Sequence, residues 1–170
     1  LISSLYNELL DKQKYLCISC DKRLKKIFER SFSGIKFVDR KSPFTVSSES
    51  KHVFSFSLGQ FLRTNIKSFK KNSKQWLYSD SKKDKEIQAL MPNVNKIKVG
   101  ISWKSPEAKQ DNKDISLLKI ISIIPKNFFE LINLQYGDIK NDKEEVWRKA
   151  KRQLILFENI DYKNDFDSLI

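Results

Sequence analysis

The carboxy-terminal half of the chain alternates between apolar extended runs and helical patterns. The extended runs are IKVGISW, FFELINLQY and LILFENI; SLLKIISII and NDKEEVWRKAKRQL separate them, and DFDSLI begins a further helix. Strands that alternate with helices of this length indicate βαβ units, whose strands are parallel and whose crossovers are right-handed. The run at residues 97–103 is almost continuously apolar, which is typical of a strand buried on both faces. We therefore expect a doubly wound, parallel α/β arrangement over residues 97–170.

The first half of the chain alternates in the same way, but less regularly. The extended runs YLCIS, IKFV and HVFSFS lie among the helical patterns LISSLYNELL, DKRLKKIFERSF, SLGQFLR and SKKDKEIQALM. We expect Asp21 to cap the second of these helices, with Leu24, Ile27 and Phe28 on one face. Pro92 stops the last helix, because the residue before a proline disfavours helical geometry. Sheets of so few strands are small for a complete domain, so we expect both halves to be parts of larger α/β domains.

Positive charge is concentrated in the first half of the chain. The 170 residues include 33 Lys and Arg and 21 Asp and Glu, a formal charge of +12. Residues 1–95 hold 19 of these cations and 9 of the acids, whereas residues 96–170 hold 14 and 12. This distribution favours an acidic partner such as nucleic acid, a phosphorylated ligand or a membrane surface. The alternative is ordinary solvated surface charge, since only six of the cations are Arg, the better fork for phosphate.

The two cysteines stand in the motif CISC, at Cys17 and Cys20. This spacing occurs in redox motifs and in half of a zinc site. A zinc site needs a second pair of ligands, and the sequence offers only one His, His52, outside any ligand pattern. On a strand, side chains three residues apart point to opposite faces. We therefore expect buried structural cysteines in a reducing compartment, with no metal and no cofactor.

The chain shows no targeting or membrane-spanning signal. No apolar run approaches the roughly 18 residues of a membrane-spanning helix. The first residues, LISSLYNELLDKQKY, lack the basic start and the small-residue cleavage site of a secretory signal peptide. The sequence therefore predicts a cytoplasmic location without a membrane span.

Five stretches of the chain occur in the order found in one protein family. They are CDKRLKKIFERSFSGIKFV, FSFSLGQFLR, KVGISWKS, INLQYGD and NIDYKNDFDSLI. Together they resemble bacterial glycosyltransferase-like proteins associated with tetratricopeptide repeats, which are related to heptosyltransferases and O-GlcNAc transferases. The similarity covers roughly residues 15–170. Ser33 stands where the family usually has a proline, and FSFSLGQFLR lacks the family's prolines.

The resemblance implies a GT-B fold, in which two Rossmann-like domains enclose a cleft. It assigns residues 1–91 to part of the amino-terminal, acceptor-side domain, residues 92–96 to a linker, and residues 97–170 to the first part of the nucleotide-sugar-side domain. Each half-domain would hold a small, mainly parallel sheet flanked by helices, and both would be incomplete. The Gly-rich turn beside the acceptor would precede the first residue, and the His- and Gly-containing segment that holds the nucleotide would follow the last.

The candidate site lies at the carboxyl ends of the second-half strands, where open α/β sheets bind ligands. The polar loop after residues 97–103 offers hydroxyls, backbone amides and cations to phosphate oxygens. The resemblance places a contact to the nucleotide diphosphate at Lys113, where the family commonly has arginine. At the end of the next strand, the ring of Tyr136 could pack on a base or a sugar, and Asp138 could accept hydrogen bonds from hydroxyls. The candidate nucleotide- and phosphate-binding residues are Ser102, Trp103, Lys104, Ser105, Lys113, Gln135, Tyr136 and Asp138.

Each part of this candidate site also has a structural interpretation. The loop is equally consistent with scattered, solvated lysines, and Asp114 beside Lys113 carries the sign of the phosphate charge. Residues 135–138 are consistent with a turn that caps the following helix. The three tryptophans, Trp76, Trp103 and Trp147, are expected in the core rather than as ligand platforms. We identify no catalytic residue, and we interpret the single His as structural or surface-exposed.

Three functions are compatible with the sequence. The one we favour is a fragment of a glycosyltransferase-like protein that transfers a sugar from a nucleotide sugar to an unknown protein or glycan acceptor, without a metal, since cations and helix N-termini can stabilise the leaving diphosphate. We expect no catalysis by this chain alone. The second is a basic module for nucleic acid or another polyanion, for which residues 65–78 interleave aromatics with cations. The third is a non-catalytic scaffold, and unpaired sheet edges would favour a homodimer.

Overall fold

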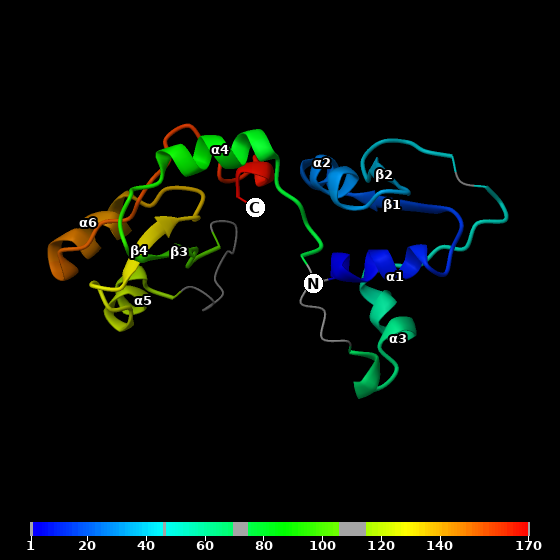
Figure 1. The fold of residues 1–170 in the computed structure, drawn as a ribbon, viewed down its shortest axis with the longest axis horizontal. Coiled ribbons are helices and arrows are strands. Elements are labelled where there is room, and N and C mark those ends of the chain that lie inside the picture. Colours follow the sequence, from blue (N-terminus) through cyan, green and yellow to red (C-terminus); the bar gives the residue numbers. More distant parts are fainter. Residues whose placement is uncertain (1, 46, 70–74, 106–114, 170) are drawn as a thin grey trace. The chain divides into compact units, whose positions relative to one another are not determined.

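The computed structural model describes residues 2–45, 47–69, 75–105 and 115–169. The chain divides into two compact units, residues 1–80 and residues 81–169 (Figure 1). The first contains η1 (Ile2–Leu5), α1 (Tyr6–Leu10), β1 (Leu16–Cys20), α2 (Lys22–Ser31), β2 (Ile35–Asp39), η2 (Ser55–Ser57), α3 (Leu58–Leu62) and η3 (Ile66–Ser68). The second contains α4 (Ser81–Leu90), β3 (Ile97–Ile101), α5 (Leu117–Ile123), β4 (Phe129–Asn133), α6 (Lys140–Ala150) and η4 (Phe166–Ser168).

Each unit holds one two-stranded parallel sheet. In the first unit β1 and β2 pair with Leu16 opposite Ile35 and Cys20 opposite Asp39, and α2 forms the crossover between them. In the second unit β3 and β4 pair in the same sense, and α5 forms the crossover. The chain is therefore a mixed α/β protein with two small parallel sheets flanked by helices, as expected, and this arrangement is compatible with a Rossmann-like one.

An aromatic cluster forms the core of the first unit. Helix α2 buries Ile27 and Phe28, which confirms the face predicted from the helical spacing. The ring of Phe28 meets those of Tyr6, Phe32 and Phe37, with centroids 5.4–6.3 Å apart across the cluster. Rings at these distances pack edge-on or tilted, which suits their quadrupoles. The cluster joins α1, α2 and β2 into one body.

Asp21 caps α2, as the sequence predicts. Its backbone is extended, and its carboxylate accepts a hydrogen bond from the Arg23 amide at 3.0 Å. The Arg23 guanidinium donates two further bonds to the same carboxylate, each 3.0 Å, and Arg40 Nη2 lies 3.3 Å from Oδ2. The side-chain and backbone hydrogen bonds from Arg23 hold the pKa of Asp21 well below its usual range. The ionised form of Asp21 is therefore the one that the fold prefers.

A pH profile of Asp21→Asn tests this preference. Asn is also a good N-cap, so the variant keeps the cap while it removes the charge and one acceptor oxygen of the contacts with Arg23 and Arg40. Because the pKa of Asp21 is lowered on folding, its charge stabilises the fold above the unfolded pKa, about 3.9. That contribution is lost as the pH falls through the folded pKa. We expect the melting temperature of wild type to exceed that of the variant at neutral pH, and the gap to shrink below about pH 4; a gap that does not change with pH would contradict this assignment.

The core of the second unit lies between its sheet and two helices. Helices α5 and α6 pack against one another, and their apolar side chains meet those of the strands. The buried cluster comprises Ile101, Trp103, Leu117, Ile121, Leu131, Val146 and Leu154. Burial is uneven along β3, however: Ile97 is 62% exposed and Ile101 is buried. The expectation of a strand covered on both faces is therefore wrong, because the core covers the face of Val99 and Ile101 and leaves Lys98 and Gly100 exposed.

The third strand predicted at residues 154–160 is reduced to a single bridge. Ile155 pairs in parallel with Ile132, the Ile155 amide donates to the Leu131 carbonyl at 2.8 Å, and the Asn133 amide donates to the Ile155 carbonyl at 2.9 Å. Two residues later the Phe157 amide donates to the Tyr162 hydroxyl instead, at 2.8 Å. A side chain thus takes the donor that a longer ladder would use, and the strand ends.

Three further expectations for single segments are wrong. Residues 52–57 contain the 3₁₀ turn η2 rather than a strand, because the Phe-Ser alternation belongs to exposed rings on a turn. Cys17 is exposed, whereas Cys20 is buried and its thiol pKa is raised by burial. The two cysteines lie on opposite faces of β1, as predicted. Because only one face of β1 is covered, only one of the two side chains is buried. Trp147 is half-exposed on α6 rather than in the core.

The two compact units divide the chain before the predicted linker at residues 92–96. Helix α4 belongs to the second unit, where it packs against η4. Lys83 Nζ lies 2.6 Å from each carboxylate oxygen of Asp165, and 3.1 Å from the Ser168 hydroxyl. Burial opposes ionisation of Asp165, but the bonds from Lys83 and Ser168 outweigh it and lower the pKa of that carboxyl. This ion pair ties the first helix of the unit to its last turn.

In the described parts of the chain, none of the helices combines the length and the apolar character that crossing a bilayer requires.

Candidate functional site

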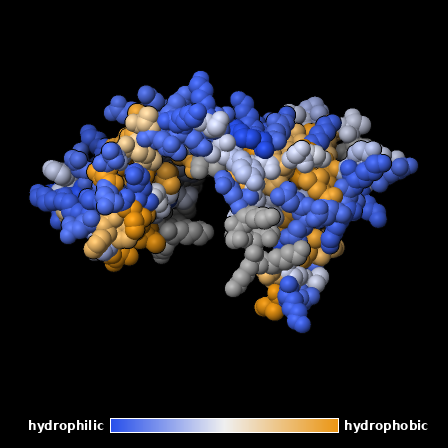
Figure 2. Space-filling model, viewed as in Figure 1, coloured by the Kyte–Doolittle hydropathy of each residue, from blue (hydrophilic) through white to orange (hydrophobic). Residues whose placement is uncertain are grey.

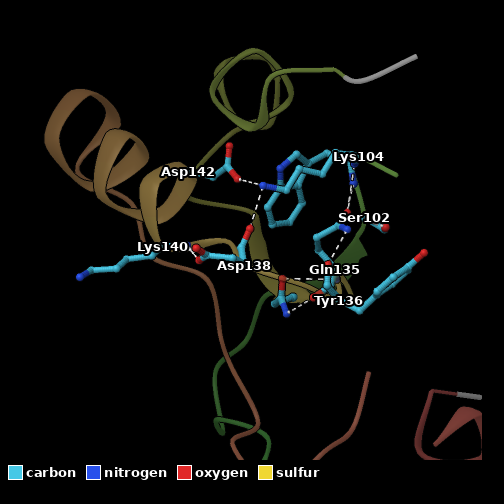
Figure 3. Close-up of polar contacts among 9 residues, drawn as sticks. Ser102, Lys104, Gln135, Tyr136, Asp138, Lys140 and Asp142 are labelled. Carbon is cyan, nitrogen blue, oxygen red and sulfur yellow. Dashed lines mark hydrogen bonds and ion pairs between the residues drawn. The ribbon is translucent and has the colours of Figure 1, made fainter. Parts of the chain in front are cut away.

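The predicted site lies at one edge of the second-unit sheet. Because β3 and β4 are parallel, their carboxyl ends share that edge, and the Leu134 amide continues the pairing to the Ile101 carbonyl at 2.9 Å. The segments that follow are residues 102–105 and 135–138 (Figure 3). The structure therefore brings together seven of the eight candidate residues; the eighth, Lys113, lies outside the described residues.

A buried carboxamide joins the two strand ends. Gln135 is 1% exposed, and its Oε1 atom accepts three hydrogen bonds. The donors are the Ser102 hydroxyl at 3.0 Å, the Trp103 amide at 2.9 Å and the Lys104 amide at 3.0 Å. We call these four residues the Gln135 network. It fixes the first turn after β3 to the first turn after β4.

Gln135 is itself held by its neighbours. Its Nε2 atom donates to the Tyr136 carbonyl at 2.9 Å. Asn133, which is also 1% exposed, donates from Nδ2 to the Gln135 carbonyl at 3.0 Å and accepts from the Gln135 amide at 3.3 Å. Every polar atom of the Gln135 side chain is therefore used, as burial requires. Asn133 is not among the residues predicted from the sequence, although it is one of two amide side chains, with Gln135, in the run FFELINLQY.

Lys104 bridges the strand end to helix α6. Its Nζ atom lies 2.5 Å from Asp142 Oδ2 and donates to the Asp138 carbonyl at 2.9 Å (Figure 3). The Lys104 and Asp142 side chains are each 26% exposed, so the pair is only partly screened by water. The sequence analysis did not include Asp142, which lies in the first turn of α6 where an acid also complements the helix dipole.

The turn between β4 and α6 takes the capping role that was the alternative interpretation. Gly137 has a φ of +85°, which a residue with a side chain rarely adopts. The Asp138 side chain accepts from the Lys140 amide at 2.9 Å, at the start of the helix. Asp138 is exposed, so this cap and contact with an incoming hydroxyl are both compatible with its position.

The two aromatic candidates differ in their surroundings. Trp103 is 5% exposed within the core of the second unit, and its Nε1 atom has no hydrogen-bond partner among the described residues. It is therefore a core residue and not a platform for a ligand. Tyr136 is partly exposed, and Lys163 Nζ lies 6.0 Å from its ring centroid. Figure 3 shows its ring directed away from the Lys104–Asp142 pair.

This edge of the sheet carries polar groups. They are the hydroxyls of the exposed residues Ser102 and Ser105, the ammonium of Lys104 and the phenol ring of Tyr136. Across the residues that the structure describes, no group of three or more His, Cys, Asp and Glu side chains is placed to hold a metal ion. No protein-family model, curated protein or solved structure matches the chain.

Proposed function

We propose that the second unit binds the diphosphate of a nucleotide sugar at the carboxyl edge of β3 and β4, and that the chain is part of a glycosyltransferase-like protein with a GT-B arrangement. One observation carries this proposal. The stretches KVGISWKS and INLQYGD were singled out separately in the sequence, and in the fold they are joined through the Gln135 network. Two parallel strand ends held in this way form the place where open α/β sheets bind nucleotides.

The diphosphate would meet Lys104 first. Its ammonium would have to exchange the Asp142 carboxylate for phosphate oxygens, since the two now lie 2.5 Å apart. The Ser102 hydroxyl donates its proton to Gln135 and would hold the loop in place, while the exposed Ser105 lies at the same edge. The partly exposed ring of Tyr136 suits a base or a sugar face. The buried side chain of Gln135 would hold Lys104 in register without contacting the ligand.

Two substitutions should change the binding of nucleoside diphosphates in opposite directions. Lys104→Ala removes the cation and should weaken binding by about tenfold or more, because a hydrogen bond to a charged group contributes about 1.5–3 kcal/mol. Asp142→Asn removes the competing carboxylate and should tighten binding by several-fold. Isothermal titration calorimetry with UDP, GDP and ADP measures both effects and also ranks the bases.

Helix α6 supplies a matched control pair. Lys149 Nζ lies 2.7 Å from Glu145 Oε1, one turn apart on the same helix and away from the sheet edge. Lys149→Ala and Glu145→Gln should leave the affinity unchanged. If no nucleoside diphosphate binds wild type, or if the Lys149 and Lys104 variants lose affinity equally, then the sheet edge is not a nucleotide site and general positive charge explains any binding.

A further inference from the structure

The most exposed apolar residues of the first unit are concentrated in one segment, residues 51–69. Sixteen large hydrophobic side chains are exposed among the described residues, and six of them lie between Val53 and Phe69. Phe56 is 89% exposed, Ile66 87% and Phe54 85%. Figure 2 shows hydrophobic residues on the surface at the lower end of this unit, below the position of α3 in Figure 1. We call residues 51–69 the exposed apolar segment.

Short helical turns fix this segment with its apolar residues outward. Leu58 and Leu62 of α3 are buried, and α3 packs against η1 and η2. The side chain of Phe61, next to Leu62, is 65% exposed, so α3 has apolar residues on both its inner and its outer side. The four Phe rings of the segment together expose on the order of 600 Å². So much exposed aromatic surface within one short segment favours a role in binding.

The charge of the segment selects the kind of partner. No Asp or Glu occurs from Ser50 to Ser79, and the exposed Lys51 and Lys67 stand near the two ends of the segment. Arg63 is engaged internally, with its guanidinium held by Glu8 through bonds of 2.8 and 2.5 Å, which raise the pKa of that arginine. A surface without acids, with lysines beside apolar side chains, complements a surface that is both negatively charged and apolar beneath.

Single-stranded nucleic acid and membranes with anionic lipid both carry negative charge beside apolar groups. The side chains of the exposed apolar segment favour the membrane. Single-stranded nucleic acid is bound by rings that stack on bases and by exposed arginines. Here Ile66 and Val53, which cannot stack, are among the exposed residues, and Arg63 already has its partner. Aliphatic and Phe side chains instead partition into the acyl region of a bilayer, while lysines reach back to the headgroups.

We propose that the exposed apolar segment is a peripheral anchor for bilayers that contain anionic phospholipid. Phe54, Phe56 and Ile66 enter the boundary between headgroups and acyl chains, and Lys51 and Lys67 contact the phosphates. The first unit then lies on the membrane without spanning it. This property is independent of nucleotide binding by the second unit.

Vesicle co-sedimentation of the whole chain tests the anchor. The probes are vesicles of phosphatidylcholine alone and of phosphatidylcholine with phosphatidylserine. We expect binding to the mixed vesicles, weaker binding to the neutral ones, and weakening by salt. The triple variant Phe54→Ser/Phe56→Ser/Ile66→Ser should lose at least about tenfold in partition coefficient. It changes only exposed side chains, and circular dichroism checks that it is folded.

Matched variants separate the anchor from general stickiness. Ile123 and Phe128 of the second unit are 80% and 65% exposed, so Ile123→Ser/Phe128→Ser removes about half as much apolar surface elsewhere and should keep vesicle binding. Three results would overturn the proposal: no binding of wild type to anionic vesicles, equal binding by wild type and the triple variant, or equal losses in the two multiple variants. Binding of single-stranded nucleic acid but not vesicles, or a dimer by light scattering that the triple variant abolishes, would assign the segment to that partner instead.

Discussion

Phe32→Ala lowers the free energy of unfolding of the first unit by about 3–5 kcal/mol, the usual cost of truncating a buried Phe. Phe32 is 1% exposed, and its ring lies 5.4 Å from that of Tyr6, 5.9 Å from that of Phe28 and 6.2 Å from that of Phe37. Removal of the ring leaves a cavity among three partners that are fixed on different elements and cannot all move into it. A loss of this size is a large part of the stability of so small a unit.

Urea unfolding followed by far-UV circular dichroism measures the loss. Hydrogen exchange with peptide mass analysis should assign it to residues 2–45 and leave the peptides of the second unit unchanged. The matched control is Phe44→Ala in the same unit, where the ring is 47% exposed and the expected change is within about 0.5 kcal/mol. Equal losses in the two variants would mean that the aromatic cluster is not the core of this unit.

The second large effect is expected at Gln135. Gln135→Ala leaves the buried Trp103 amide and the partly buried Lys104 amide without their acceptor, and removes the bond to the Ser102 hydroxyl. Each buried donor left unpaired costs about 1–3 kcal/mol. We therefore expect the free energy of unfolding of the second unit to fall by about 2–4 kcal/mol. Tryptophan fluorescence during urea unfolding reports on this unit through Trp103 and Trp147, and a Trp76→Phe background removes the signal of the first unit.

Two variants test whether the hydrogen bonds cause that loss. Gln135→Met restores most of the side-chain volume without the acceptor, so it should remain nearly as destabilised as Gln135→Ala. Gln88→Ala removes an exposed glutamine from α4 and should change stability by no more than about 0.5 kcal/mol. If Met restores the wild-type stability, packing volume rather than the Gln135 network holds the two strand ends together.

Local sequence signals predicted the elements better than their extent. The helix after Asp21 followed from its cap and from the spacing of Ile27 and Phe28, which act within one or two turns. The prediction of a strand at 154–160 was wrong because a side chain just beyond it, the Tyr162 hydroxyl, takes the Phe157 amide and ends the pairing. A strand was predicted where the structure has the turn at 55–57, because alternating Phe and Ser are compatible with both. The alternation alone does not say whether other elements cover the Phe side chains.

The candidate site shows the same division. Topology placed Ser102, Lys104 and Gln135 at one edge, because parallel strands end together, and the structure confirms that proximity. The sequence did not reveal that Gln135 is satisfied from within, or that Lys104 is already paired with Asp142. The partners of Gln135 lie 31–33 positions earlier in the chain, and the partner of Lys104 lies 38 positions later. Nucleotide binding at this edge stays a prediction.

The ion pair between Lys83 and Asp165 has a consequence for how the second unit forms. Its two residues are separated by 82 positions, so α4 leaves the ribosome long before its partner η4 exists. Closing so long a loop is slow and comes late, because its entropic cost precedes any gain. On a growing chain, β3, α5, β4 and α6 can assemble first, before α4 makes its contacts with η4. Helix α4 can therefore pack into the unit only after η4 has been synthesised.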